Sequence, residues 1–389
     1  MLSLTALTRV DSCKLRHVYV NKPNRKSTDE LAELRSALIQ NSLFPPTTLM
    51  RAIERLGFVQ ADPIRAPARA QDLILRHRVK NYKAGGLEKR YPKLDLDEDF
   101  TFAYGFLPNQ HRDLLHPRCK FTLSPIERKV VNAVKKAGTA HPVEVDKICG
   151  GGNTRNAWGG QSKLTKQALE KAHHHGFLRV ARRDKGIRVY EVAKQLKQEL
   201  SKKQRFKELL KIAACLFGPT SESFLMKEAR YYRHLVETPA ARRVALAELI
   251  EESMLERRSV AGVEYIWPLN FRKRSSKNEC VRLLAPFDPV VRDRDRFEQL
   301  WGWTYRFEAY TPAAKRIRGY YALPLLWKED IIGWANAKVV DAHLQVETGY
   351  VRQPQDSKRF KKALDAEIGA LANFLRLADD AWTISSDAS

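Results

Sequence analysis

The chain has few cysteines and no long apolar run. Its 389 residues include only five cysteines, which form no Cys-x-x-Cys pair: Cys13, Cys119, Cys149, Cys215 and Cys280. An odd and scattered set supports neither a disulfide framework nor a zinc site, which favours a reducing compartment. No stretch approaches the roughly 20 apolar residues that a membrane helix needs. We therefore expect no membrane association.

The first 28 residues lack the apolar core of a signal peptide and include Asp11. Arg9, Lys14 and Arg16 give this segment a weak transit-peptide character, which leaves an organellar destination open. We expect a cytoplasmic protein that associates with the bacterial nucleoid.

Acidic residues are outnumbered by basic ones. The chain has 69 Lys and Arg against 45 Asp and Glu, a formal net charge of +24, while 43% of its residues are hydrophobic. A basic excess in a chain that can still form folded cores indicates a polyanionic partner. Nucleic acid is the commonest such partner, and an anionic membrane surface is the second. At this length we expect two to four folded units.

Residues 57–64, Gly-Phe-Val-Gln-Ala-Asp-Pro-Ile, carry the main candidate for chemistry. Gly57 ends a helix expected over 47–56, because glycine readily adopts the left-handed C-cap conformation. In the strand that follows, the two-residue period places Gln60 and Asp62 on one face, roughly 7 Å apart. The neighbouring arginines, Arg65 and Arg69, suit chemistry on a cationic centre held near phosphates.

A simpler interpretation is that Asp62-Pro63 only starts a turn and that Gln60 is a solvated strand residue. This stretch by itself does not decide between the two interpretations.

Three units with the same order of elements are expected. In the second and third, three helices precede two strands that flank the turns Asp184-Lys185-Gly186 and Ala261-Gly262. This order is typical of winged helix-turn-helix motifs, in which the third helix enters the major groove and the hairpin contacts the DNA backbone. The expected boundaries are 28–121, 122–204 and 205–270.

The last part of the chain, 279–380, is rich in expected strands. These strands cover 281–284, 305–310, 320–326 and 331–339, and an amphipathic helix over 358–378 closes the chain. The predicted fold class is therefore α+β: three tandem winged helix-turn-helix motifs, a small C-terminal β-sheet or barrel domain and a closing helix.

Charge is unevenly distributed. From Arg179 to Lys207 there are eleven Lys or Arg and three acids, which form either a surface that follows DNA phosphates or a solvated helix face. The run Asp95-Leu96-Asp97-Glu98-Asp99 is expected to be a solvated loop that keeps its face away from DNA.

Two further motifs are better explained by structure than by ligand binding. Gly150-Gly151-Gly152 lacks the Gly-Lys-Ser/Thr of a phosphate-binding loop, so a flexible connection is expected. The side chains of His173-His174-His175 point in different directions on a helix, which disfavours metal binding and suits the helix C-terminus.

A long and specific pattern occurs near the C-terminus. It consists of Ala285-Pro286-Phe287-Asp288-Pro289-Val290-Val291-Arg292-Asp293-Arg294, Phe307-Glu308-Ala309-Tyr310-Thr311-Pro312-Ala313-Ala314-Lys315-Arg316 and Gly319-Tyr320-Tyr321-Ala322-Leu323-Pro324. This pattern is similar to the C-terminal signature of the winged-helix DNA glycosylases of the AlkZ and YcaQ type. Gln60-Ala61-Asp62 resembles the Gln-x-Asp version of their catalytic motif. The resemblance extends from about residue 28 to about residue 378.

The resemblance implies three winged-helix motifs and a C-terminal β-domain around a basic channel. It also implies monofunctional glycosylase activity on alkylated purines, unhooking of interstrand crosslinks, and catalytic roles for Gln60 and Asp62. Residues 62–72 differ from the better-known members, which leaves the preferred lesion open.

The chemistry is consistent with a single carboxylate. Glycoside hydrolases usually need two carboxyls, but an N7-alkylated purine is already cationic and leaves without being protonated. Asp62 would stabilise the developing oxocarbenium ion and activate the attacking water, which Gln60 would position. This reaction needs neither a metal nor a cofactor, and no lysine beside the motif suggests Schiff-base chemistry.

We predict that a monomer binds double-stranded DNA containing alkylated or crosslinked purines. The predicted DNA contacts are Arg65, Arg69, Lys163, Arg179, Arg182, Arg183, Lys185, Arg188, Lys315 and Arg316. Two alternatives are a structure-specific RNA binder, although no stacking-aromatic motif supports it, and a non-catalytic winged-helix DNA-binding protein or transcriptional regulator, in which Asp62 is a turn residue.

Overall fold

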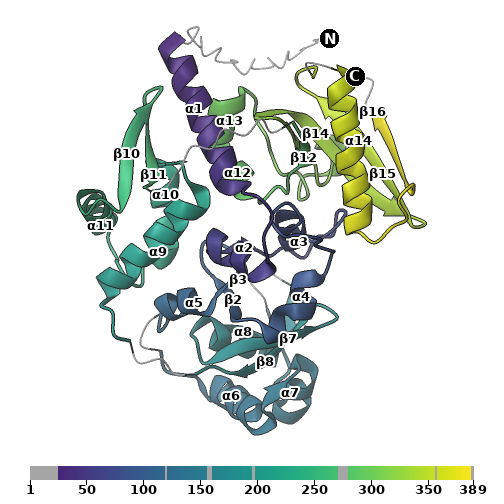
Figure 1. Cartoon of the computed structure of the whole chain (residues 1–389). Helices are drawn as coiled ribbons and strands as arrows, with labels where there is room; N and C mark the ends of the chain where they lie inside the picture. The colour runs from purple at the N-terminus through teal and green to yellow at the C-terminus, as the bar shows by residue number, and fades with distance from the viewer. Residues whose placement is uncertain are drawn as a thin grey trace, which may run out of the picture.

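The computed structural model describes residues 25–118, 121–155, 160–194, 198–269, 279–354 and 357–386. Helices and strands alternate along the chain, in agreement with the expected α+β class. Figure 1 shows a first unit at the centre of the molecule, a second below it, a third at the upper left and a β-rich C-terminal part at the upper right. None of the described helices is long and apolar enough to cross a membrane.

The first unit surrounds a three-stranded sheet with the order β1-β3-β2. Its elements are α1 (Arg25–Ser42), α2 (Leu49–Leu56), β1 (Val59–Gln60), α3 (Ala70–Leu75), α4 (Gly86–Arg90), the 3-10 helix η1 (Tyr91–Lys93), β2 (Leu96–Phe100), β3 (Tyr104–Pro108) and α5 (Asn109–Leu115). The apolar side of α2, including Ile53 and Leu56, is buried.

The second unit has a sheet with the order β4-β8-β7. Its elements are α6 (Pro125–Ala137), β4 (Thr139–Ala140), α7 (Pro142–Cys149), the small hairpin of β5 (Asn153–Arg155) and β6 (Gln161–Lys163), α8 (Leu164–His174), β7 (Leu178–Asp184) and β8 (Ile187–Val192). Ser124 caps α6 in a capping box with Glu127, so the predicted helix start at Ser124-Pro125 is confirmed. The predicted hairpin around Lys185 is also confirmed.

The third unit has a sheet with the order β10-β11-β9. Its elements are α9 (Lys202–Phe217), β9 (Thr220–Ser221), α10 (Glu222–Ala229), the 3-10 helix η2 (Arg230–Tyr232), α11 (Pro239–Glu251), β10 (Leu255–Val260) and β11 (Val263–Pro268). In all three units the first strand follows a helix, and the last strand lies between the other two. The three units therefore share one topology.

The C-terminal part contains a five-stranded sheet, β12-β13-β14-β15-β16. Its elements are β12 (Val281–Leu283), α12 (Pro289–Arg292), α13 (Arg294–Trp301), the 3-10 helix η3 (Ala313–Lys315), β13 (Leu323–Trp327), β14 (Asp330–Val340), β15 (His343–Tyr350), α14 (Ser357–Phe374) and β16 (Trp382–Ser386). Leu364, Ile368 and Leu371 bury the apolar side of α14. The closing helix is confirmed, with β16 as an additional strand after it.

Two of the local predictions for strands and loops are wrong. Residues 305–310 form no strand; they contribute aromatic side chains, and the ring of Tyr305 packs against that of Phe297. The acidic run 95–99 is not a solvated loop, because most of it forms β2. Asp97, Glu98 and Asp99 are 3%, 1% and 1% exposed. Sequence alone did not show that each of these carboxylates meets a cation in the folded chain.

Candidate active site

The predicted catalytic motif lies on β1 and on the loop that follows it. Gly57 ends α2 with a φ of 74°, which confirms the predicted C-cap. β1 then pairs with β3, where Gln60 lies opposite Gly105. A Cβ at position 105 would lie 2.3 Å from the carbonyl oxygen of Val59, so only glycine allows the two strands to approach this closely. The sheet therefore fixes the direction of the Gln60 side chain.

Arg292 orients the amide of Gln60. Its guanidinium donates one hydrogen bond to Gln60 Oε1 and another to Glu228 Oε2 at 3.0 Å. The ring of Phe102 lies 4.6 Å from the same guanidinium. Because Oε1 already accepts a bond, the NH2 group of Gln60 is the part left to donate to a water molecule or a substrate.

A buried ion pair places Arg292. Asp288 caps the single turn of α12, and its Oδ1 accepts from the backbone N–H of Val290 at 3.1 Å. The two carboxylate oxygens of Asp288 also accept from Arg78 at 2.8 and 3.0 Å, and both side chains are completely buried. Such a bidentate pair compensates two buried charges and fixes their geometry. It joins the first unit to α12, whose last residue is Arg292.

Asp62 lies just beyond the end of β1 and is partly buried. Its Oδ1 accepts a hydrogen bond from the backbone N–H of Ile64 at 2.9 Å, which is the turn contact that the simpler interpretation expects. Within the described part of the chain, Oδ2 has no hydrogen-bond partner. Burial raises the pKa of Asp62, and the bond from Ile64 opposes this rise. A raised pKa makes the ionised carboxylate a stronger base.

Two side chains hold the loop that carries Asp62. The backbone N–H of Asp62 donates to Gln71 Oε1 at 3.3 Å, and Gln71 in turn donates to Glu88 Oε1 at 3.2 Å. Arg69 forms an ion pair with the same Glu88 oxygen. The loop is therefore fixed from α3 and α4, and Asp62 does not depend on the Ile64 contact alone for its position.

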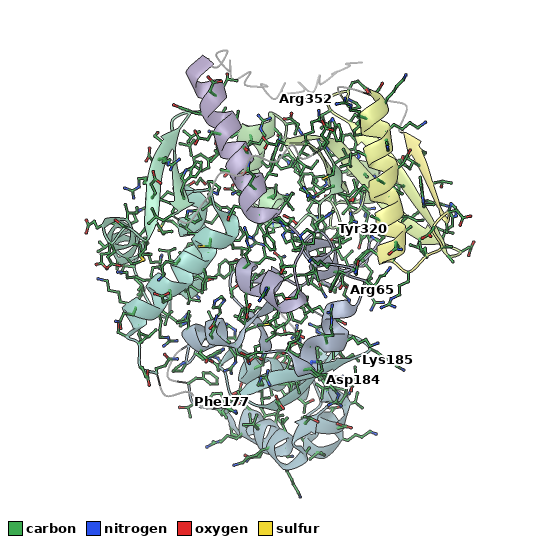
Figure 2. All side chains as sticks on the ribbon, viewed as in Figure 1. Arg65, Phe177, Asp184, Lys185, Tyr320 and Arg352 are labelled. Carbon is green, nitrogen blue, oxygen red and sulfur yellow. The ribbon has the colours of Figure 1, made fainter. Side chains whose placement is uncertain are left out.

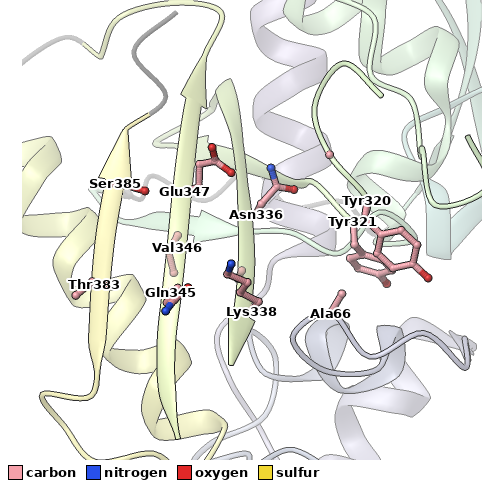
Figure 3. Close-up of a pocket in the computed structure, with 12 residues that line it drawn as sticks. Ala66, Tyr320, Tyr321, Asn336, Lys338, Gln345, Val346, Glu347, Thr383 and Ser385 are labelled. Carbon is pink, nitrogen blue, oxygen red and sulfur yellow. The ribbon is translucent and has the colours of Figure 1, made fainter. Parts of the chain in front are cut away.

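A cavity of about 610 Å3 begins beside this loop. Ala66, Tyr320 and Tyr321 form one wall, and polar side chains of β14 to β16 form the other, as Figure 3 shows. Tyr321 is 3% exposed, and no described residue accepts or donates a hydrogen bond at its hydroxyl. Burial raises the pKa of Tyr321 far above its usual range, and the charge of Asp62 adds to this effect. Neither Gln60 nor Asp62 lines the cavity, but Tyr321 connects it electrostatically to Asp62.

Most of the ten predicted DNA-binding residues also make contacts within the protein, and in four of them these contacts involve side chains that are mainly shielded from solvent. Arg179 donates to Asp97 at 3.0 Å, and Arg183 donates to Glu98 at 2.8 Å. Arg69 pairs with Glu88, as described above. Arg188 lies 4.0 Å from the centre of the Tyr104 ring and is largely buried. We therefore no longer assign Arg69, Arg179, Arg183 and Arg188 to DNA, because their charges are already compensated or shielded inside the protein.

Six predicted residues remain: Arg65, Lys163, Arg182, Lys185, Lys315 and Arg316. Arg65, Lys163, Lys185 and Lys315 are exposed, whereas Arg182 and Arg316 are partly buried and donate to Asp184 and to the carbonyl oxygen of Thr311. Figure 2 shows Tyr320, Arg65 and Lys185 one below another on the right side of the molecule. The hairpin of the second unit reaches the motif here, because a Cβ on Gly186 would lie 2.5 Å from Arg69 Nη2. Lys185, at the tip of this hairpin, is thus close to the loop that carries Asp62.

Reasoning from the sequence did not assign functions to Arg292, Glu228 and Tyr321. Arg292 and Tyr321 belong to the C-terminal pattern that carries the family resemblance, which is the only signal that could have pointed to them. Gln60 and Arg292 are 232 positions apart, so no local spacing connects them.

Comparisons with known proteins identify the family and the fold of the chain. The profile of a protein family described as "DNA glycosylase AlkZ-like" matches residues 53–374, which include Gln60, Asp62, Arg292 and Tyr321. The fold is similar to that of the Streptomyces sahachiroi DNA glycosylase AlkZ, with a TM-score of 0.60 and 13% sequence identity. The match covers 91% of this chain and 98% of that protein. At this identity the structural match shows a common fold.

Proposed function

The chain belongs to the family of AlkZ-like DNA glycosylases, and we propose that it hydrolyses the N-glycosidic bond of cationic, N7-alkylated purines, including purines in interstrand crosslinks. One observation supports this proposal most directly. Arg292 orients Gln60, while Asp62 beside it keeps one carboxylate oxygen without a partner among the described residues. One carboxylate and one oriented amide match a reaction whose leaving group needs no acid.

In this mechanism the bond between C1′ and N9 breaks, and its electron pair neutralises the charge of the alkylated purine. The negative charge of Asp62 stabilises the oxocarbenium ion that forms on the sugar. Asp62 Oδ2 accepts a proton from the attacking water, whose oxygen bonds to C1′. The NH2 group of Gln60 donates to that water and holds it in place. The cavity beside Tyr321 gives room for the alkylated base or for the remainder of a crosslink.

We interpret the three units of common topology as winged-helix motifs that bind the DNA backbone. The six basic residues named above would then contact phosphates and give binding that tolerates any sequence, as a repair enzyme requires. This assignment places Lys185 and Arg65 next to the catalytic loop.

The direct test is release of 7-methylguanine, or unhooking of a nitrogen-mustard crosslink, from duplex DNA by the purified protein without added metal. We expect both activities to persist in EDTA. Loss of activity in EDTA would contradict the proposed mechanism, and failure on every alkylated substrate would contradict the proposed lesion class. A matched RNA duplex, bound as tightly as the DNA duplex, would contradict DNA as the substrate.

A further inference from the structure

A second cavity, of about 490 Å3, shares no lining residue with the cavity beside Tyr321 and is lined by arginines, histidines and one tyrosine. Three segments form it: the residues after α5, the end of α8, and η2 with the turn that follows. Its lining residues are Arg118, His174, His175, Arg230, Tyr231, Arg233 and His234. No carboxylate is among them. The two histidines of the His173-His174-His175 tract that face this cavity thus join arginines, which disfavours a metal ion and favours an anion.

Arg118 gives the cavity a rigid, built wall. It is 6% exposed, and it donates to the carbonyl oxygen of His174 and to Asp99 Oδ1, both at 2.8 Å. The ring of His175 is stacked on that of Phe121, with centroids 3.6 Å apart. His234 Nε2 lies 3.1 Å from the carbonyl oxygen of Leu115. These contacts hold Arg118, His175 and His234 in place before any ligand arrives.

The opposite wall carries charge that the protein does not compensate. Arg230 and Arg233 are exposed, and neither forms an ion pair with any residue that the structure describes. This contrasts with Arg179 and Arg183, whose partners are buried acids.

Two histidines of the cavity have lowered pKa values. Burial, followed by the charge of Arg118, lowers the pKa of His174 to about 4 and that of His234 to about 3. Both rings are therefore neutral near pH 7, because burial and the charge of Arg118 disfavour their protonated forms, and at His174 these effects outweigh the opposing charge of Asp99.

The cavity is connected to the active site through a short piece of backbone. Glu228, which holds Arg292 and thereby Gln60, precedes Arg230 by two residues. Tyr232, on the same 3-10 helix, is buried. A ligand bound by Arg230 would therefore be held at a fixed position relative to Glu228 and Arg292, the side chains that orient Gln60.

We propose that this cavity binds one backbone phosphate of the DNA and so sets the register of the duplex over the active site. Guanidinium groups match the geometry of phosphate oxygens, and the single N–H of the neutral His174 ring can supply a further hydrogen bond. The inference rests on the proposed function only in taking the bound DNA as the source of the phosphate.

The test is a scan with neutral methylphosphonates, placed one at a time along a duplex that contains a stable abasic-site analogue. We expect the wild-type protein to lose about tenfold in affinity at the phosphate that the cavity holds, the magnitude of one charge-assisted contact. Arg230→Ala/Arg233→Ala should bind the unmodified duplex about tenfold more weakly and should no longer respond at that one position. Its responses at the other positions should be unchanged.

Lys361→Ala/Lys362→Ala is the matched control, since it removes the same net charge from exposed positions of α14, outside the three units. It should keep the full wild-type pattern of responses. A double variant that retains every wild-type response, or a control that loses the same one, would overturn the proposal. Thermal melting checks that the variants are folded.

Inorganic phosphate, titrated alone, distinguishes a free anion from DNA. One combination of results would assign the cavity to a free anion and overturn the DNA proposal. In it, phosphate stabilises the wild type but not Arg230→Ala/Arg233→Ala, and the methylphosphonate scan finds no position that depends on these arginines. The scan measures binding only. A positive scan in a protein that excises no alkylated base would leave this site standing and contradict the proposed lesion class.

Discussion

The junction between the first strand and the next helix differs between the units, although their topology is the same. In the second unit one residue, His141, separates β4 from α7, and in the third unit β9 passes directly into α10. In the first unit nine residues, 61–69, separate β1 from α3. The catalytic candidates lie at this extended junction.

The polar side chains at the two short junctions serve the helices that follow. His141 Nδ1 accepts from the backbone N–H of Val143 at 3.2 Å, and Ser221 Oγ accepts from that of Phe224 at 3.2 Å. At the long junction, Asp62 caps no helix and Gln60 contacts Arg292. The same position in one topology therefore stabilises a helix in two units and is available for chemistry in the third.

Among the variants at these junctions, Asp62→Asn should have the largest effect on the rate of excision. The change removes the charge but nearly preserves the shape, so excision should slow by about 10²–10³, or about 2.7–4 kcal/mol. Single-turnover excision of 7-methylguanine measures the effect. Asparagine also favours turns, so if Asp62 only formed a turn, the variant would melt, bind and excise like the wild type.

The pH dependence of excision should identify the same group. Below its pKa, Asp62 takes up a proton and loses the charge that stabilises the oxocarbenium ion, so the rate should fall as the pH falls. Because burial raises this pKa, the midpoint of the fall should lie above the 3.8 of an unperturbed aspartate. The acid limb should be absent in Asp62→Asn. An acid limb that persists in this variant, after correction for spontaneous depurination, would assign the titration to another group.

Gln60→Ala should have a smaller effect, about tenfold in rate, or roughly 1.4 kcal/mol, because Gln60 only positions water. The same single-turnover assay applies, with duplex affinity as the control, and affinity should not change. An effect as large as that of Asp62→Asn would indicate that the amide contributes directly to stabilising the transition state.

Ser221→Ala should lower stability without slowing excision, whereas the variants at the first junction should slow excision. Loss of an N-cap costs about 1 kcal/mol of stability, so the free energy of unfolding should fall by about that amount in denaturant titrations. Excision should stay at the wild-type rate. If the variant were as stable as the wild type but excised more slowly, Ser221 would contribute to the reaction and not to helix capping, and the proposed difference between the junctions would be wrong.

Local sequence patterns predicted the frame of the site but not its partners. The C-cap at Gly57, the start of the strand after it and the hairpin around Lys185 follow from short-range rules about glycine, period and turns. The strand ends at Gln60, so the prediction that Asp62 shares a strand face with Gln60 is wrong. Arg292 could not be linked to Gln60, since only tertiary packing through the Arg78–Asp288 pair brings them together.

The acidic run failed as a prediction for the same reason. A charged segment is usually solvated, but Asp97, Glu98 and Asp99 face cations from other segments, including Arg179, Arg183 and Arg118. Burying paired charges is compatible with a strand, and these three arginines are 19 to 85 positions away from the carboxylates they pair with.

The smallest expected effect distinguishes the exposed basic residues from a basic residue that pairs with a buried acid. Arg65→Gln/Lys185→Gln should reduce the slope of log affinity against log salt by about 0.9 for each phosphate that the variant no longer binds. Over a fourfold change in salt, each such phosphate corresponds to about 3.5-fold in affinity. Arg183→Gln should behave differently: it leaves Glu98 buried without its cationic partner, so it should lower the melting temperature without changing the slope. If Arg183→Gln flattens the slope while Arg65→Gln/Lys185→Gln does not, DNA would contact the hairpin through its inner face, and the assignment of the two sets would have to be exchanged.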